Sequence, residues 1–136
     1  MALDAFDTDV LIYAASSNNS LGRGVLALFA SGSYPVGVGS VLLIPELLIK
    51  PVRRAAVDER SRIEFLLARL DLLEIDRSVA LLATDLGARY RLKGPDAIHL
   101  ATAALAGADR FITNNRKDFP QTIEEIDVVY PDELVG

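Results

Sequence analysis

Short apolar runs alternate along the chain with longer stretches of helical spacing. The runs of strand length cover residues 3–6, 36–38, 73–75, 110–112 and 127–130. Between them, apolar residues recur every three or four positions over residues 10–15, 21–29, 41–49, 63–70, 79–90 and 94–104, which predicts helices. Strands that alternate with such helices predict an α/β fold, with a mostly parallel sheet of about five strands and helices on both faces.

Local signals refine the boundaries of these helices. We expect the second helix to end near Gly32. Ser40 can cap the helix that follows, and Pro45 must either kink that helix or mark its start. Pro95 suits the first position of the last helix, because the N–H that proline lacks is not needed there.

The composition is that of one globular domain, which we expect to cover residues 1–136. Half of the residues are apolar and a quarter are charged, as in soluble proteins. No apolar stretch reaches the roughly 20 residues of a membrane span, and the N-terminus lacks the pattern of a signal peptide. The chain has no cysteine, which excludes disulfides, thiolate zinc sites and cysteine nucleophiles. We therefore expect a cytoplasmic protein with no membrane contact.

The net charge of −5 argues against a protein that coats nucleic acid through a basic surface. An acidic chain can still act on nucleic acid if its acids share one pocket with a metal ion and basic residues surround that pocket. The basic residues do cluster, at positions 53–54, 60–62, 89–93 and 116–117. Ordinary solvated helix surface explains such clusters equally well.

Acidic and amide side chains stand near the predicted strand ends, where α/β sheets bind their ligands. Asp7 and Asp9 follow the first strand, Glu46 lies in the helix after the second, and Asp96 opens the helix before the fourth. The fourth strand runs into the segment TNNRKDF, residues 113–119. Four separate segments therefore place an acid or an amide near one rim of the sheet.

Each of these side chains could have a purely local role. Asp9 is a good helix cap, and Asp96 in a first helical turn interacts favourably with the helix dipole. Glu46 is harder to explain this way, because an acid within an apolar helix needs a partner. Carboxylates gathered at close range are tolerated when a hard cation such as Mg²⁺ or Mn²⁺ lies among them. Such a metal ion can activate a water molecule for phosphodiester hydrolysis.

Four stretches carry a resemblance to a known family. They are FDTDVLIYA (6–14), the apolar helix with Glu46, GPDAIHLATA (94–103) and FITNNRKDF (111–119). In this order and spacing they resemble the PIN-domain nucleases, and most closely the VapC-type toxins of bacterial and archaeal toxin–antitoxin pairs. The resemblance covers nearly the whole chain, including YPDEL at 130–134. It implies a single PIN domain and a Mg²⁺- or Mn²⁺-dependent endoribonuclease.

The resemblance also implies which residues form the active site. Asp7, Glu46 and Asp96 match the three principal acids, which hold the metal ion and serve catalysis. Asn115 falls where many members carry a fourth catalytic acid. Asparagine retains a carbonyl oxygen that can orient a metal-bound water, but it lacks the negative charge. This difference bears on whether a second metal ion is held.

Further residues are implied to surround the principal acids. Thr8 and Asp9 match a small polar pair that often lines the site, and Thr113 and Asp118 belong to the last motif. Asp118 could supply the acid that Asn115 lacks, although the acid at this place is usually peripheral. His99 lies one helical turn after Asp96, and we interpret it as a packed histidine with one satisfied nitrogen rather than a general acid or base.

The resemblance implies three partners. Toxins of this type cut structured RNA, are usually homodimers, and are silenced by a small antitoxin protein that inserts a segment into the acidic site. The leucine-rich helices near residues 21–29 and 63–72 are candidates for contact with another chain. The antitoxin should present an arginine or lysine to Asp7, Glu46 and Asp96, because that cation can replace the charge of the metal.

Two alternatives remain open from the sequence. In the first, the Asp-x-Asp of Asp7 and Asp9 belongs to a haloacid-dehalogenase-like phosphatase, in which Asp7 is the nucleophile. That reading leaves Glu46 without a role, and the segment 113–119 supplies poorly the further acids that such an enzyme needs. In the second, the chain is a binding module with a PIN fold whose nuclease site has decayed, and Asn115 marks the first loss.

Overall fold

A computed structural model describes residues 2–16, 19–31 and 33–134. Its centre is a five-stranded sheet with the strand order β3-β2-β1-β4-β5, in which all neighbouring strands are parallel. The strands are β1 (Asp4–Phe6), β2 (Gly37–Ser40), β3 (Leu70–Leu73), β4 (Arg110–Ile112) and β5 (Asp127–Val129). This sheet confirms the predicted α/β class.

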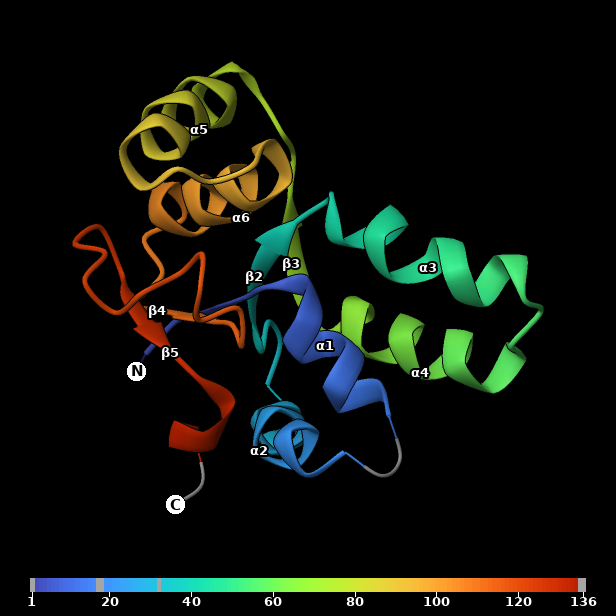
Figure 1. Ribbon diagram of the computed structural model, residues 1–136. Helices are drawn as coiled ribbons and strands as arrows, with labels where there is room; N and C mark the ends of the chain where they lie inside the picture. Colours follow the sequence, from blue (N-terminus) through green and yellow to red (C-terminus); the bar gives the residue numbers. More distant parts are fainter. Residues whose placement is uncertain (1, 17–18, 32, 135–136) are drawn as a thin grey trace.

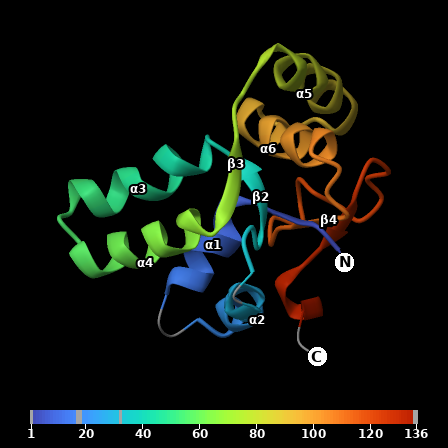
Figure 2. The same cartoon turned by 180° about the vertical axis from the view of Figure 1, so that it is seen from behind.

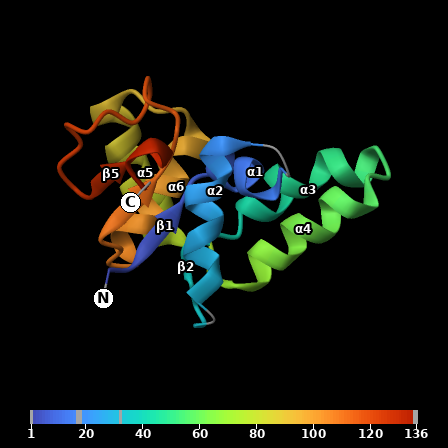
Figure 3. The same ribbon diagram turned by 90° about the horizontal axis from the view of Figure 1, so that it is seen from below.

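Helices cover both faces of the sheet, as predicted. They are α1 (Thr8–Ala15), α2 (Ser20–Leu28), α3 (Leu43–Arg53), α4 (Val57–Ala68), α5 (Arg77–Tyr90) and α6 (Gly94–Leu105), with short 3₁₀ turns at Phe29–Ser31 and Pro131–Leu134. Helices α5 and α6 pack together on one side, whereas α1, α2 and α4 lie on the other (Figure 1). The antiparallel pair α3 and α4 projects away from the sheet as an arm, which Figure 2 and Figure 3 show from two further directions.

Two hydrophobic cores follow from the alternation of side chains along the strands. Ala5 and Phe111 point into the core beneath α5 and α6, whereas their neighbours Phe6 and Ile112 point into the core formed with α1, α2 and α4. The central strands β1 and β4 are therefore apolar on both faces, which is typical of strands in a parallel sheet that helices cover on both sides.

The position of the third strand differs from the prediction. We expected it at residues 73–75, but β3 comprises Leu70–Leu73, and α4 ends at Ala68. Leu70 had been assigned to the apolar stripe of the helix, whereas it pairs with Gly37 of β2 as the first residue of the strand. A leucine at the junction continues the helical spacing and also fits a strand, so periodicity alone cannot place the boundary.

The start of α3 resolves the two possibilities for Pro45. The helix begins at Leu43, so Pro45 lies within its first turn, where an N–H group has no partner inside the helix. Ser40 does not cap the helix itself, because its hydroxyl accepts a hydrogen bond from the N–H of Leu42, the residue before the first turn. The helix also extends beyond the predicted end, to Arg53.

Two other helix ends bear on the predictions. Helix α6 begins at Gly94, so Pro95 occupies its second position rather than its first. The end that we expected near Gly32 lies outside the described residues, and α2 itself ends at Leu28. None of the helices in the described ranges is long and apolar enough to cross a membrane.

Candidate functional site

Asp7 is the acid nearest the centre of the sheet. It follows β1 directly, caps the N-terminus of α1, and is only 5% exposed. Its carboxylate accepts hydrogen bonds of 2.8 Å from the N–H of Thr8 and from the hydroxyl of Thr113. Burial raises the pKa of Asp7, and Glu46 adds to this, whereas His99 and the two hydrogen bonds oppose it. In the described part of the chain, no lysine or arginine forms an ion pair with Asp7.

Asp9, in the first turn of α1, holds the loop that follows β4. One carboxylate oxygen accepts a hydrogen bond of 3.1 Å from the N–H of Asn114, whereas the other is buried and has no hydrogen-bond partner in the part of the chain that the structure describes. Burial, followed by the negative charge of Asp7, raises the pKa of Asp9 to about 7. The N-terminus of α1 thus carries two acids whose charges are poorly compensated.

Glu46 reaches this edge from the first turn of α3. Its Oε1 atom accepts a hydrogen bond of 2.6 Å from the hydroxyl of Thr8 and lies 2.6 Å from Nε2 of His99. Its side chain is 29% exposed. Burial favours a higher pKa for Glu46, but the contacts with His99 and Thr8 outweigh it and lower the pKa below its usual value. Glu46 is therefore an ionised carboxylate held between α1 and α6.

Asp96 lies in the first turn of α6 and is half-buried. Burial, together with the negative charges of Asp7, Asp118 and Glu46, raises its pKa, and His99 partly opposes this. Its side chain makes no hydrogen bond to the rest of the described chain. Hydrogen bonds of Asp7 to Thr113 and of Glu46 to Thr8 and His99 bring segments far apart in sequence to one edge. We call it the acidic edge (Asp7, Asp9, Glu46, Asp96 and Asp118).

Asn115 and Asp118 are bonded to each other. The amide nitrogen of Asn115 donates a 3.1 Å hydrogen bond to Asp118, and the amide oxygen accepts one of 3.3 Å from the N–H of Asp118. The N–H of Asn115 in turn donates to the hydroxyl of Thr113, which is fully buried and bonded to Asp7. Asn115 therefore shapes the loop, while the charge that acts on Asp96 comes from Asp118.

The donors at the acidic edge suit a hard cation, but they do not form a finished cage. Among the described residues, no group of three or more Asp, Glu or His side chains is arranged to hold a metal ion. Mg²⁺ does not require one, because it usually keeps several waters and binds one or two protein carboxylates. Asp7 and Asp96 form such a pair, and the unpartnered buried oxygen of Asp9 adds to the uncompensated negative charge.

His99 has a more specific role than the sequence suggested. It is 3% exposed with one ring nitrogen bonded, as we expected, but the partner of that nitrogen is Glu46. The available signal was the spacing, since residues three positions apart on a helix share a face and His99 follows Asp96 at that interval. A second missed contact is the ion pair between Asp4 and Arg110, at the other end of β1.

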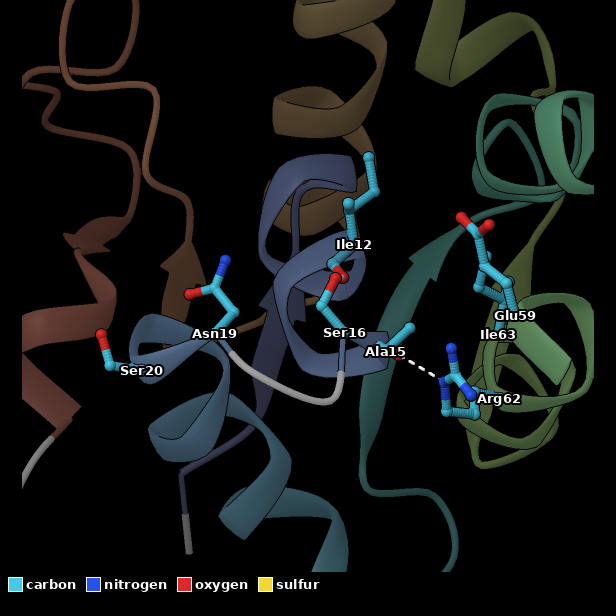
Figure 4. A pocket seen from close by; sticks show the side chains of 8 residues that line it. All are labelled: Ile12, Ala15, Ser16, Asn19, Ser20, Glu59, Arg62 and Ile63. Carbon is cyan, nitrogen blue, oxygen red and sulfur yellow. Dashed lines mark hydrogen bonds between the residues drawn. The ribbon is translucent and has the colours of Figure 1, made fainter.

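A separate hollow of about 570 Å³ lies away from these acids. Figure 4 shows its lining at the far end of α1, between the start of α2 and the helix α4, where Nε of Arg62 donates a hydrogen bond to the carbonyl of Ala15. Its one acid is Glu59, and it contains none of the residues of the acidic edge. We therefore place the candidate site at the acidic edge, where the carboxylates are coupled, rather than in this hollow.

Comparison with known proteins supplies independent evidence. The sequence matches the family model of the PIN domain over residues 5–124. No curated protein matches the sequence significantly.

Three solved structures share the fold. A toxin–antitoxin complex from Klebsiella pneumoniae contains a chain with 29% identity and a TM-score of 0.74, and the match covers 96% of this chain and 98% of that one. VapBC2 from Rickettsia felis, bound to a DNA fragment from its promoter, gives 17% identity, a TM-score of 0.73 and coverages of 94% and 98%. DNA-bound VapBC from Salmonella typhimurium gives 21% identity, a TM-score of 0.69, and coverages of 96% of this chain and 99% of that one.

Proposed function

The chain belongs to the PIN domain family, and on this premise we propose that it is a Mg²⁺- or Mn²⁺-dependent endoribonuclease and the toxin of a toxin–antitoxin pair. Membership of this nuclease family implies a hydrolase that acts on nucleic acids. Membership of the PIN family excludes the haloacid-dehalogenase-like alternative, in which Asp7 is the nucleophile. We propose that Asp7 is instead a ligand of the metal ion. RNA as the substrate and the divalent metal as the cofactor are the finer parts of the proposal.

The observation that carries the metal dependence is the uncompensated charge of Asp7 and Asp96. Each of these acids is partly or fully buried, each lies near further carboxylates, and neither forms an ion pair with a lysine or arginine of the described chain. His99 is the basic side chain that acts on both of them, and it compensates only part of the charge. Such an arrangement costs stability unless a cation is bound. A divalent ion with several waters and the phosphate of a substrate would complete the site.

The residues of the acidic edge and its two threonines have different proposed roles. Asp7 and Asp96 would hold the metal ion, and Glu46 would contribute a third carboxylate beside them. When bound, the ion lowers the pKa of a water molecule and stabilises the leaving oxygen of the phosphodiester. Thr8 and Thr113 fix the orientation of Asp7 through their hydrogen bonds, and they leave it no cationic partner.

Asp118 provides the fourth negative charge, because Asn115 is uncharged where many members of the family carry an acid. Its charge raises the pKa of Asp96, whereas the side chain of Asn115 is engaged by Asp118 through both its oxygen and its nitrogen. Asn115 therefore acts by holding Asp118 toward the acidic edge. This arrangement supports one firmly held metal ion more directly than two.

The assignment as a toxin rests on the structural relatives. The Klebsiella chain belongs to a toxin–antitoxin complex and matches this chain over nearly the full length of both. We propose that a small antitoxin binds this protein and places an arginine or lysine against Asp7, Glu46 and Asp96, where it substitutes for the metal charge. We further propose that the protein is a homodimer that acts on RNA in the cytoplasm.

Cleavage of RNA by the purified protein tests the enzyme. We expect cleavage with Mg²⁺ or Mn²⁺, none with excess chelator, and none from Asp96→Asn, whose circular dichroism should match the wild type. Cleavage that survives the chelator or this substitution would disprove a metal nuclease. An intact RNA with the wild-type protein and metal would instead favour the decayed binding module.

Expression in cells tests the toxin. Expression of the chain alone should arrest growth, and co-expression with the small neighbouring gene should restore it. Asp96→Asn is the control for toxicity, because it should be harmless when expressed alone. Normal growth on expression of the active wild-type protein would retain the nuclease but remove the toxin from the proposal.

A further inference from the structure

The contact between His99 and Glu46 joins two elements of the site. His99 projects from α6, Glu46 from α3 and Thr8 from α1, and their polar atoms meet at one carboxylate oxygen. Oε1 of Glu46 lies 2.6 Å from both the Thr8 hydroxyl and Nε2 of His99. Within the described chain, Oε2 of Glu46 makes no hydrogen bond. The two oxygens of this carboxylate are therefore in different surroundings.

The surroundings of the imidazole determine which of its nitrogens carries the proton. Nε2 faces an ionised carboxylate, which can only accept hydrogen bonds. Nδ1 is buried and has no hydrogen-bond partner among the described residues. The geometry therefore places a proton on Nε2, which donates it to Glu46.

We propose that His99 is a positioning residue that, together with Thr8, fixes the Glu46 carboxylate through Oε1 and leaves Oε2 as the oxygen offered to the metal ion. The inference rests on the proposed function, because it assigns Glu46 to the metal site. Two donors on one oxygen stop rotation of the carboxylate, which otherwise has several rotatable bonds and a partly exposed position. His99 itself touches neither metal nor substrate.

The other groups that face His99 are consistent with this role. Asp7, Glu46 and Asp96 all interact electrostatically with it, but only Glu46 lies within hydrogen-bond distance. The Thr8 hydroxyl is 3.3 Å from Nε2, a longer contact than the one that Thr8 makes to Glu46. His99 is thus directed at one acid of the edge rather than shared among three.

The tautomer can be observed without any metal ion. The chain contains one histidine, so ¹⁵N-labelled untagged protein gives a single imidazole in a long-range ¹H–¹⁵N spectrum. We expect a protonated Nε2, and we expect its resonance to shift in Glu46→Gln. An Nε2 without a proton, or a spectrum that Glu46→Gln leaves unchanged, would overturn the proposed contact.

Mn²⁺ binding to the metal-free protein, measured by calorimetry, tests the positioning. His99→Leu keeps the bulk and removes the donor, and should weaken Mn²⁺ binding about ten-fold, as the loss of a hydrogen bond to a ligand typically does. His99→Gln places an amide N–H near the position of Nε2 and should recover most of the affinity. Thr8→Val, which removes the other donor to Oε1, should weaken binding in the same direction as His99→Leu.

The outcomes separate the two proposals. Wild-type protein that binds no Mn²⁺ overturns both the metal site and the positioning role. Wild-type protein that binds Mn²⁺ while His99→Leu binds equally well overturns the positioning role alone. Equal loss in His99→Leu and His99→Gln, with folded protein in both, would assign His99 to packing, because the donor would then make no difference.

Discussion

Asp4 and Asp7 stand at opposite ends of the strand β1, and they are buried to nearly the same extent, with 6% and 5% exposure. Asp4 forms a two-point ion pair with Arg110 on the neighbouring strand, with N–O distances of 2.7 and 3.0 Å. Asp7 has only neutral donors, the N–H of Thr8 and the hydroxyl of Thr113. One strand therefore carries a neutralised acid at its start and an acid without a counter-charge at its end.

The difference shows how a structural acid and a candidate ligand are distinguished. Asp4 and Arg110 carry opposite charges, and Arg110 donates a hydrogen bond to each carboxylate oxygen of Asp4. This pair therefore needs no ligand from outside the chain. At the other end, helix capping explains one hydrogen bond to Asp7, but it does not explain why Asp9, Glu46 and Asp96 gather nearby. Negative charge that gathers with His99 as its one basic neighbour in the described chain supports the proposal that a cation from outside completes the site.

The largest expected effects come from substituting the two acids at the ends of β1, Asp7 and Asp4. Asp7→Asn should reduce RNA cleavage about 100-fold or more, because it removes a proposed ligand of the metal ion. In the metal-free protein the same change should raise the melting temperature, because it removes repulsion within the acidic edge. Asp4→Asn should leave the cleavage rate per folded molecule unchanged and lower stability by about 1–3 kcal/mol, because Arg110 loses its charged partner.

Cleavage assays and thermal melts of the two variants, each with and without Mg²⁺, make this comparison directly. Each variant removes one buried carboxylate, either within β1 or directly after it, so each serves as the control for the other. If Asp4→Asn and Asp7→Asn affect stability in the same direction without metal, the distinction between a paired and an unpaired acid is wrong.

A medium effect concerns the pH dependence of stability without metal. The pKa of Asp9 in the folded protein is about 7, above the ordinary value of 3.8. The folded state then binds the proton more tightly than the unfolded state, so this contribution to stability is present at low pH and is lost as the pH rises toward 7. With chelator present, the melting temperature should fall between pH 5 and pH 8 by on the order of 5 °C.

Asp9→Asn should flatten this dependence, whereas Asp85→Asn, at an exposed position on α5, should leave it unchanged. Asp7 and Asp96 act in the same direction as Asp9, since burial raises their pKa values as well. Glu46 acts in the opposite direction, because its pKa is lowered. A profile that is identical in the wild type and in Asp9→Asn would contradict the assignment to Asp9.

The smallest effect concerns the basic residues around the acids. All three lysines of the chain are close in sequence to an acid of the acidic edge: Lys50 is one helical turn after Glu46, Lys93 precedes the first turn of α6, and Lys117 adjoins Asp118. All three are exposed and free to meet RNA phosphates. Each substitution by alanine should weaken RNA binding a few-fold and reduce the salt slope by about 1.

Binding titrations over a range of salt concentrations measure this effect, with Arg23→Ala as the control. Arg23 is exposed on α2, so its substitution removes one positive charge from a helix that carries none of the acids of the acidic edge. A loss of affinity in Arg23→Ala equal to that in the lysine variants would mean that the RNA responds to net charge and not to the lysines at the edge.

The sequence was sufficient to predict the fold class and the positions of the acids near the strand ends. Apolar runs and helical spacing predicted the alternating elements, and the position of Asp7 after a strand and of Asp96 in a first helical turn followed from them. Periodicity misplaced β3, because Leu70 fits a helix and a strand equally well. The roles of the site residues stay predictions until the variants are measured.

Contacts across the sheet could not be read from the chain. The pairing of Asp4 with Arg110 depends on β1 and β4 being neighbours, and periodicity does not give the strand order. The contact of His99 with Glu46 depends on the arm of α3 approaching α6, which no local pattern encodes. Local patterns therefore predict which residues occupy an edge, whereas the partners of each residue depend on the topology.

The placement of β1 between β2 and β4 has a consequence for synthesis of the protein. Asp7 and its partner Thr113 are 106 positions apart in the chain, as are Asp4 and Arg110. A growing polypeptide that has already exposed Asp7, Glu46 and Asp96 still lacks the strand that anchors them, and contacts of such long range form late. The nascent chain should therefore stay harmless through most of its translation. An inhibitory partner that is already present could then bind the protein as soon as the active form appears.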